Sequence, residues 1–204
     1  GQDGGMVFID PNAPADQKYR MVIRIKEFGK GLHVFSSPDG IHWKLTHTSV
    51  VDYRPQERGH HLDSQNVLFW DAGLGKYVTY VRRNVSKEGS QGRSIARGES
   101  DRLDGFPVVQ EMPVVLGPDQ NDLFHGGRPA VDYYMSAAIR YPWGDNAYFM
   151  FPTAYYHFVG GVLPEFKGEI PTNAGPLHTQ FAASRDGVRW ERFDREPFVP
   201  LGMK

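Results

Sequence analysis

Residues 62–83, LDSQNVLFWDAGLGKYVTYVRR, contain the pattern that decides the fold. The segment has an aspartate, an apolar strand at Asn66–Trp70, a tight turn rich in Asp and Gly, and a second strand at Lys76–Arg82. Two apolar and aromatic runs separated by such a turn are typical of a β-hairpin. We therefore predict a hairpin here and compare the rest of the chain with it.

The same pattern occurs three times. An aspartate opens each hairpin and a tyrosine begins its second strand, in the pairs Asp3 and Tyr19, Asp63 and Tyr77, and Asp132 and Tyr148. When the three copies are aligned on Ser37, Ser100 and Ser184, their third strands and the turns that follow also keep the same order. Self-similarity of this kind indicates a repeat protein.

We place the units at about residues 1–51, 52–117 and 118–204. Four antiparallel strands in each repeated unit predict the blades of a β-propeller, here a single all-β domain with few helices. The remaining expected strands are Val7–Ile9, Tyr19–Ile25, Leu32–Phe35, Trp43–His47, Ser94–Arg97, Val108–Glu111, Tyr134–Tyr141, Tyr148–Tyr155 and Thr179–Ala183.

Composition agrees with this fold class and excludes some functions. The chain of 204 residues has 13% aromatic residues, 23 glycines and 15 prolines, which favours short strands and many turns. A net charge of −1 gives no field that would recruit nucleic acid or an anionic membrane. There is no cysteine and no apolar run of about eighteen residues, so we expect neither a thiolate metal site nor a membrane-spanning helix.

The repeated units also resemble a known family of proteins. The segments DGGMVFIDPNAP, DSQNVLFWDAGLGKYVTYVRR and SRDGVRWER resemble the five-bladed β-propeller glycoside hydrolases of families 32, 43, 68 and 117, and look most like an uncharacterised bacterial branch labelled family 32-like. The resemblance covers all three units but only about three of five blades. Because the chain starts at Gly1 and ends in a strand-like stretch, we expect a piece of a longer protein, with the remaining blades as its partners.

The resemblance also implies roles for the repeated aspartates. The innermost strands of a propeller line its central channel, and glycosidic cleavage needs two carboxyl groups flanking the bond. By position, Asp3 would be the base or nucleophile, Asp63 would orient the sugar or tune its neighbour, and Asp132 would donate the proton. Asp132 stands where the resembled families have Glu, so His125 or His157 is an alternative donor.

Further side chains are candidates for substrate binding. Charged and polar groups can hold sugar hydroxyl or carboxylate groups, and aromatic rings can stack on pyranose rings. The candidates are Arg54, His61, Gln65, Arg82, Arg128, Tyr155 and His157. We expect no metal ion and no cofactor, because adjacent histidines such as His60 and His61 point to opposite sides of a strand.

Several acids and aromatic residues have a structural explanation. Asp10 and Asp71 align at the hairpin turns, where Asp accepts hydrogen bonds from its own backbone. The Ser-x-Asp-Gly-x-x-Trp turns resemble shortened sialidase Asp-boxes, so we expect Trp43 and Trp190 in the core. The three repeated aspartates could likewise bond to backbone amides alone.

Three functions therefore remain open. The chain could be part of a secreted or periplasmic glycoside hydrolase that acts on a polysaccharide or oligosaccharide. It could be a carbohydrate-binding propeller without catalysis. It could also be a glycoside phosphorylase, in which Arg54, His60, His61 and Arg128 would supply a phosphate site. The sequence leaves the sugar, the linkage and the stereochemistry undetermined, because stereochemistry depends on the separation of the carboxylates.

Overall fold

The structure is a computed structural model that describes residues 4–54, 62–87, 90–122, 124–125, 128–129, 131–157, 175–200 and 202. Side chains are described for most of these residues, but not for 86–87, 90–91, 124–125 and 128–129. In this part of the chain antiparallel strands dominate, and the helices are three short 3₁₀ turns, η1 (Ala15–Gln17), η2 (Lys26–Phe28) and η3 (Val109–Glu111). None of the described helices is long and apolar enough to span a membrane.

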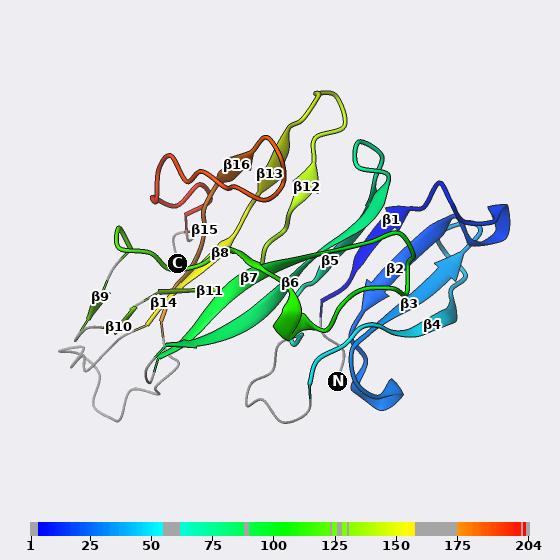
Figure 1. Cartoon of the computed structure of the whole chain (residues 1–204), viewed down its shortest axis with the longest axis horizontal. Coiled ribbons are helices and arrows are strands. Elements are labelled where there is room, and N and C mark those ends of the chain that lie inside the picture. The colour runs from blue at the N-terminus through cyan, green and yellow to red at the C-terminus, as the bar shows by residue number, and fades with distance from the viewer. Residues whose placement is uncertain are drawn as a thin grey trace.

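The first two units are four-stranded antiparallel meanders (Figure 1). The first has strand order β1-β2-β3-β4 and the second has β5-β6-β7-β8, so neighbours in sequence are neighbours in the sheet. The strands of the first unit are β1 (Met6–Ile9), β2 (Tyr19–Ile23), β3 (Leu32–Ser37) and β4 (Lys44–Val51). Those of the second are β5 (Val67–Asp71), β6 (Lys76–Lys87), β7 (Ser90–Ser100) and β8 (Val114–Leu116).

The third unit has the same strand order but is divided into two three-stranded halves, β11-β14-β15 and β12-β13-β16. Pro152 interrupts its second strand, since proline has no N–H to donate to the ladder, and Ala137 has φ of 42° between the halves of its first strand. The strands are β11 (Val131–Tyr133), β12 (Ile139–Arg140), β13 (Tyr148–Met150), β14 (Thr153–Tyr156), β15 (Leu177–Thr179) and β16 (Ala182–Ser184). Within this unit, a two-stranded ladder of β9 (Phe124–His125) and β10 (Arg128–Pro129) precedes β11.

The sheet register confirms the alignment of the repeats. Each tyrosine that begins a second strand pairs directly with the serine that ends the third strand of the same unit, as the sequence alignment required. The pairs are Tyr19 with Ser37, Tyr77 with Ser100, and Tyr148 with Ser184. All-β sheets with this shared register are consistent with propeller blades.

Some expected strands were wrong. Val108–Glu111 is not the fourth strand of the second unit, because this segment, which lies between Pro107 and Pro113, forms the 3₁₀ turn η3 and the fourth strand is β8. Tyr134–Tyr141, Tyr148–Tyr155 and Thr179–Ala183 are not continuous strands, for the reasons given above. Conversely, β6 and β7 extend well beyond the expected Lys76–Arg82 and Ser94–Arg97.

Two of the repeated turns have the same internal bonds. In Ser37–Trp43 and Ser184–Trp190 the serine Oγ accepts the glycine N–H, and the tryptophan Nε1 donates to the glycine carbonyl at 3.1 Å. Both glycines have positive φ, 78° and 71°, which an L side chain rarely adopts. Both tryptophans are half-buried. Trp190 packs against the core as expected, whereas Trp43 is not among the described side chains that pack against it, so its expected place in the core was wrong.

A repeated hydrogen bond links each unit to the next. Tyr77 of the second unit donates to the Asp10 carboxylate of the first at 3.0 Å, and Tyr148 of the third unit donates to Asp71 of the second at 2.6 Å. Burial is the main cause that raises the pKa of Tyr148 to about 12, and the hydrogen bond to Asp71 raises it further in the same direction. Both carboxylates are buried and also accept backbone N–H groups, so the turn role expected for Asp10 and Asp71 is confirmed.

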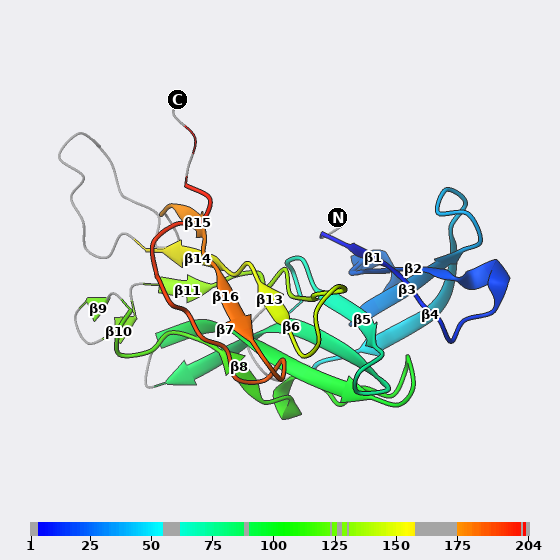
Figure 2. The same cartoon turned by 90° about the horizontal axis from the view of Figure 1, so that it is seen from above.

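The units share one hydrophobic core. Buried side chains of the first unit (Val22, Leu32), the second (Leu68, Tyr80) and the third (Met150) belong to the same cluster. Tyr80 also donates through its hydroxyl group to the carbonyl of Gly187 in the third unit at 2.7 Å. Figure 2 shows the three units side by side, with the second unit between the first and the third.

The tyrosine–aspartate links predict a selective loss of stability. Tyr148→Phe should lower the free energy of unfolding by about 2 kcal/mol, because a hydrogen bond to a buried carboxylate is lost. Tyr19→Phe is the matched control: Tyr19 has the same position in the first unit, and no described residue accepts its hydroxyl, so little change is expected. Urea unfolding measures both, and equal stability of the two variants would contradict the assignment.

Candidate functional site

Asp132 lies in β11 at the contact between the second and third units. Its Oδ1 accepts the backbone N–H of Arg93 at 2.8 Å, and its Oδ2 accepts the Arg93 guanidinium. The Nε2 of His157 lies 2.8 Å from the same Oδ2 and must donate to it, since a carboxylate only accepts. Three donors therefore surround one buried carboxylate.

Asp63 lies four residues before β5, not at its first residue, and forms an ion pair with the Arg82 guanidinium. The side chain of Arg82 is 3% exposed and that of Asp63 is 26% exposed. Burial lowers the pKa of Arg82, and the charge of Asp63 counteracts this effect. The Nε and Nη1 of Arg82 have no hydrogen-bond partner among the residues that the structure describes.

Tyr134 joins the two acid–arginine pairs into one cluster. The Arg82 guanidinium carbon lies 4.9 Å from the centre of the Tyr134 ring, and that of Arg93 lies 5.6 Å from it. Cations over an aromatic face are attracted by its quadrupole. Asp63 and Asp132, which come from different units, are thus connected through a continuous set of contacts.

Two more aromatic rings complete this cluster on the third unit. Tyr155 pairs directly with Asp132 across the sheet and lies edge-on to Tyr134, with ring centres 6.1 Å apart. The ring of His157 lies 4.4 Å from that of Tyr155. The Nδ1 of His157 is buried and has no hydrogen-bond partner in the described part of the chain. We call this set the acid–arginine cluster: Asp63, Arg82, Arg93, Asp132, Tyr134, Tyr155 and His157.

The other candidates from the sequence lie elsewhere or are not described. Arg54 pairs with Glu111 on η3 and, among the described residues, has no contact with the acid–arginine cluster. Gln65 is half-buried beside Gly4, where a Cβ on the glycine would lie 3.4 Å from the Gln65 Cβ. Asp3 and His61 lie outside the described residues, and so do the side chains of Arg128 and His125.

Sequence reasoning missed Arg93 and Tyr134. Arg93 of β7 pairs with Asn84 of β6, and Asn84 follows Arg82 by two residues. Because side chains two residues apart in a strand lie on one face, Arg93 shares a sheet face with Arg82, and this pairing is the signal that could have identified it. The expected strand Ser94–Arg97 began one residue too late to include it. Tyr134 was assigned to a strand, but it follows β11 in an irregular segment.

A second polar cluster stabilises the third unit without any resemblance to a catalytic site. Arg192 pairs with Asp119 and Asp122, and Arg195 pairs with the same two carboxylates. The bond from Arg195 lowers the pKa of Asp119 to about 2. These pairs join residues 192–195 to the segment of the third unit that precedes β11. Within the described residues, no group of three or more His, Asp or Glu side chains is arranged to hold a metal ion.

No family model matches the chain, and no curated protein matches it either. Solved structures do match. An endo-1,4-beta-xylanase from Bacteroides thetaiotaomicron aligns with a TM-score of 0.56 and 13% identity over 98% of this chain. A beta-1,2-mannobiose phosphorylase from Listeria innocua aligns with a TM-score of 0.58 and 16% identity over 99% of this chain. An N-acetylgalactosamine deacetylase from F. plautii aligns with a TM-score of 0.57 and 15% identity over 96% of this chain.

The chain thus has a fold found in carbohydrate-active enzymes. It spans 55% of the xylanase chain, 46% of the phosphorylase chain and 52% of the deacetylase chain, which is about half of each. At these identities the likeness shows the fold alone. A xylanase, a phosphorylase and a deacetylase carry out three different reactions, so the reaction depends on side chains and not on the fold.

The Asp63–Arg82 pair predicts a stability effect. Asp63→Asn should leave a buried guanidinium uncompensated and lower the free energy of unfolding by about 2 to 3 kcal/mol, at the low end for buried pairs because Asp63 is partly exposed. The double variant Asp63→Asn/Arg82→Met should recover part of that loss, because no buried charge remains. Urea unfolding of the three proteins checks this, and an Asp63→Asn variant as stable as wild type would show that the pair does not form.

Proposed function

We propose that this chain carries part of the catalytic site of a glycoside hydrolase. The observation that carries the proposal is the acid–arginine cluster, in which Asp63 and Asp132 come together from two units. Cleavage of a glycosidic bond needs an acid and a base or nucleophile on either side of it. The fold shared with carbohydrate-active enzymes supports this reading.

The contacts of Asp132 favour a different role from proton donation. Arg93 directs two donors at this carboxylate and His157 a third, so both of its oxygens already accept hydrogen bonds from the protein. His157 can instead hold the proton. Its Nε2 is oriented by Asp132, and its Nδ1 has no hydrogen-bond partner among the described residues. We assign proton donation to His157 and its orientation to Asp132.

The opposite role, base or nucleophile, stays with Asp3, for which the resemblance is the only support. Gly4 lies against Gln65, two residues from Asp63, which places the start of the described chain near the second unit's acid. Asp63 and Arg82 would then orient the sugar. Tyr134 and Tyr155 offer rings on which a pyranose could stack.

The rest of the expected architecture belongs to the same proposal. Closure into a five-bladed propeller, with further blades beyond the three units, would form the channel that these acids line. A secreted or periplasmic location would suit an enzyme that degrades a polysaccharide. The similarity to solved chains of about twice this length supports the further blades, and has no bearing on the location.

The proposed donor predicts a dependence on the leaving group. His157→Ala should lower kcat/KM on natural disaccharides by about 100-fold or more, and far less on aryl glycosides with activated leaving groups, which need little protonation. Asp132→Asn should show the same pattern to a smaller extent, because it disturbs the orientation of His157. The assay uses matched aryl glycosides and disaccharides of several sugars, each with and without added phosphate.

Arg54→Gln is the control, because it removes the charge of an arginine that pairs with Glu111 and lies outside the acid–arginine cluster. It should retain wild-type rates. An equal loss for His157→Ala on both kinds of substrate would exclude His157 as the donor. Sugar binding without turnover by the wild type would contradict the hydrolase and leave a binding module, and turnover only with phosphate would indicate a phosphorylase.

A further inference from the structure

Arg82 makes fewer hydrogen bonds than its burial requires. Its side chain is 3% exposed and its Nη2 pairs with Asp63, but its Nε and Nη1 have no hydrogen-bond partner among the described residues. Guanidinium nitrogens only donate, so each of the two needs an acceptor oxygen. A buried charged donor without an acceptor costs free energy, and such groups are rare in folded proteins. The missing acceptors point to a ligand that supplies them.

The positive charge of Arg82 is also only partly balanced. Burial lowers the pKa of Arg82 below its ordinary value, the negative charge of Asp63 counteracts this effect, and the positive charge of Arg93 adds to it. Because the net result is a lowered pKa, Asp63 does not fully compensate the charge of the guanidinium. A second negative charge beside Arg82 would therefore be bound favourably. The ligand that fits this position is an anion.

Two tyrosine rings lie beside the guanidinium groups. The guanidinium carbons of Arg82 and Arg93 lie 4.9 Å and 5.6 Å from the centre of the Tyr134 ring, and Tyr155 lies edge-on to that ring. Both rings are half-buried, and the side chains of Asp63 and Arg93 are 26% and 17% exposed, so the cluster reaches the solvent. An aromatic ring can lie against the apolar face of a pyranose. A sugar that carries a carboxylate group would satisfy both the rings and Arg82.

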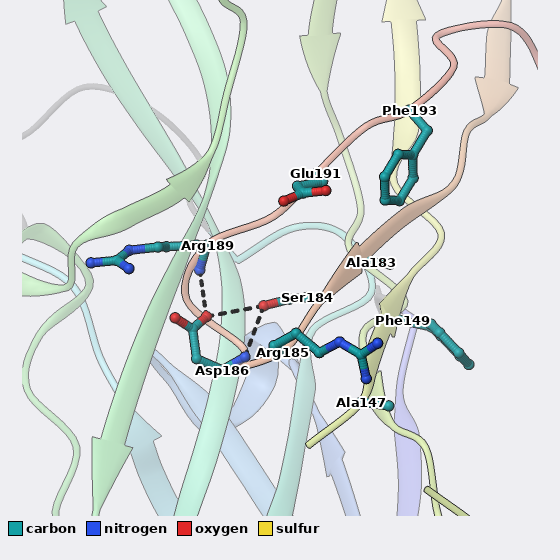
Figure 3. A pocket seen from close by; sticks show the side chains of 9 residues that line it. All are labelled: Ala147, Phe149, Ala183, Ser184, Arg185, Asp186, Arg189, Glu191 and Phe193. Atoms are coloured by element: carbon teal, nitrogen blue, oxygen red, sulfur yellow. Dashed lines mark hydrogen bonds between the residues drawn. The ribbon is translucent and has the colours of Figure 1, made fainter. Parts of the chain in front are cut away.

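A cavity in the third unit offers a contrast, because its carboxylate already has donors. The cavity has a volume of ≈ 540 Å³ and lies between Phe149, Phe193 and the turn that begins at Ser184 (Figure 3). The carboxylate of Asp186 in this turn accepts the Ser184 hydroxyl at 3.0 Å and the backbone N–H of Arg189 at 2.7 Å. Its hydrogen bonds stabilise the turn itself. The unmet donors of Arg82 therefore place the ligand at the acid–arginine cluster.

We propose that the acid–arginine cluster binds the carboxylate group of a uronic acid, and that Arg82 is the residue that selects it. The Arg82 guanidinium donates to the sugar carboxylate, and Tyr134 lies against the pyranose ring. Arg93, which pairs with Asp132, adds positive charge to the same site. The substrate class is then an acidic glycan. This assignment rests on the proposed function for the reaction, whereas the binding of the uronic acid does not depend on catalysis.

The test compares pairs of methyl glycosides whose members differ only in the oxidation of C6. Methyl glucuronide is paired with methyl glucoside, and methyl galacturonide with methyl galactoside, each as both anomers. In NMR titrations the protein should bind at least one uronide about 10-fold more tightly than its neutral partner, which is the effect of one hydrogen bond to a charged group. The variant Asp63→Asn/Arg82→Met, in which this ion pair is removed as a whole, should lose that preference. Urea unfolding verifies that the variant is folded.

Arg54→Gln is the matched control, because Arg54 pairs with Glu111 outside the cluster, and this variant should keep the preference. Equal affinity within every pair, no binding of any of these sugars, or a preference that persists in the double variant would each overturn the uronate site. Inorganic phosphate that displaces the uronide and binds as tightly would replace it with a phosphate site.

Aryl glycosides of the same sugars separate this inference from the proposed function. Binding of a uronide without turnover of its aryl glycoside would contradict the hydrolase and leave the uronate site in place. Turnover of neutral aryl glycosides that is as fast as that of the uronides would support the hydrolase and overturn the uronate site.

Discussion

The burial of one sheet's carboxylate against the next sheet's donor is the interaction on which this structure depends. Asp10 and Asp71 end or follow the first strand of their units, and each accepts the tyrosine hydroxyl of the following unit. A buried carboxylate that loses a donor is costly, and although Arg20 of the same unit also pairs with Asp10, each unit gains stability when the next unit is in place. The same dependence makes the row of units cooperative, because repeats of this kind are stabilised mainly by their neighbours.

The acid–arginine cluster uses this principle with charged donors. Asp132 meets Arg93 across the contact between the second and third units, and Asp63 meets Arg82 within the second. Removing one partner of a buried pair destabilises a protein strongly, whereas the intact pair adds little stability over apolar packing. The cluster has two such pairs, and nitrogens of Arg82 and His157 have no hydrogen-bond partner among the described residues, so its contribution to stability is small. This is a further argument for the site that we propose.

The order of strands and turns in the three units could be predicted from the sequence, because the tyrosine of the second strand and the serine after the third recur in each unit. It also placed Asp63, Asp132, Arg82, Tyr155 and His157 in one candidate set, and the structure gathers all five. The length of the β6–β7 hairpin could not be predicted, since its outer pairs are polar and glycine-rich, and it is this extension that carries Arg93 to Asp132. Pro152 and the segment between Pro107 and Pro113 ended strands that propensity alone would have continued.

The central claim is that contacts between units build the site, and the Arg93–Asp132 contact tests it most directly through a double-mutant cycle. Urea unfolding would be measured for the wild type, Arg93→Met, Asp132→Asn and the double variant. The account predicts a coupling energy of about 2 kcal/mol, because the two groups meet at a buried interface. Additive effects of the two substitutions, within about 0.5 kcal/mol, would show that they do not interact and would contradict the account.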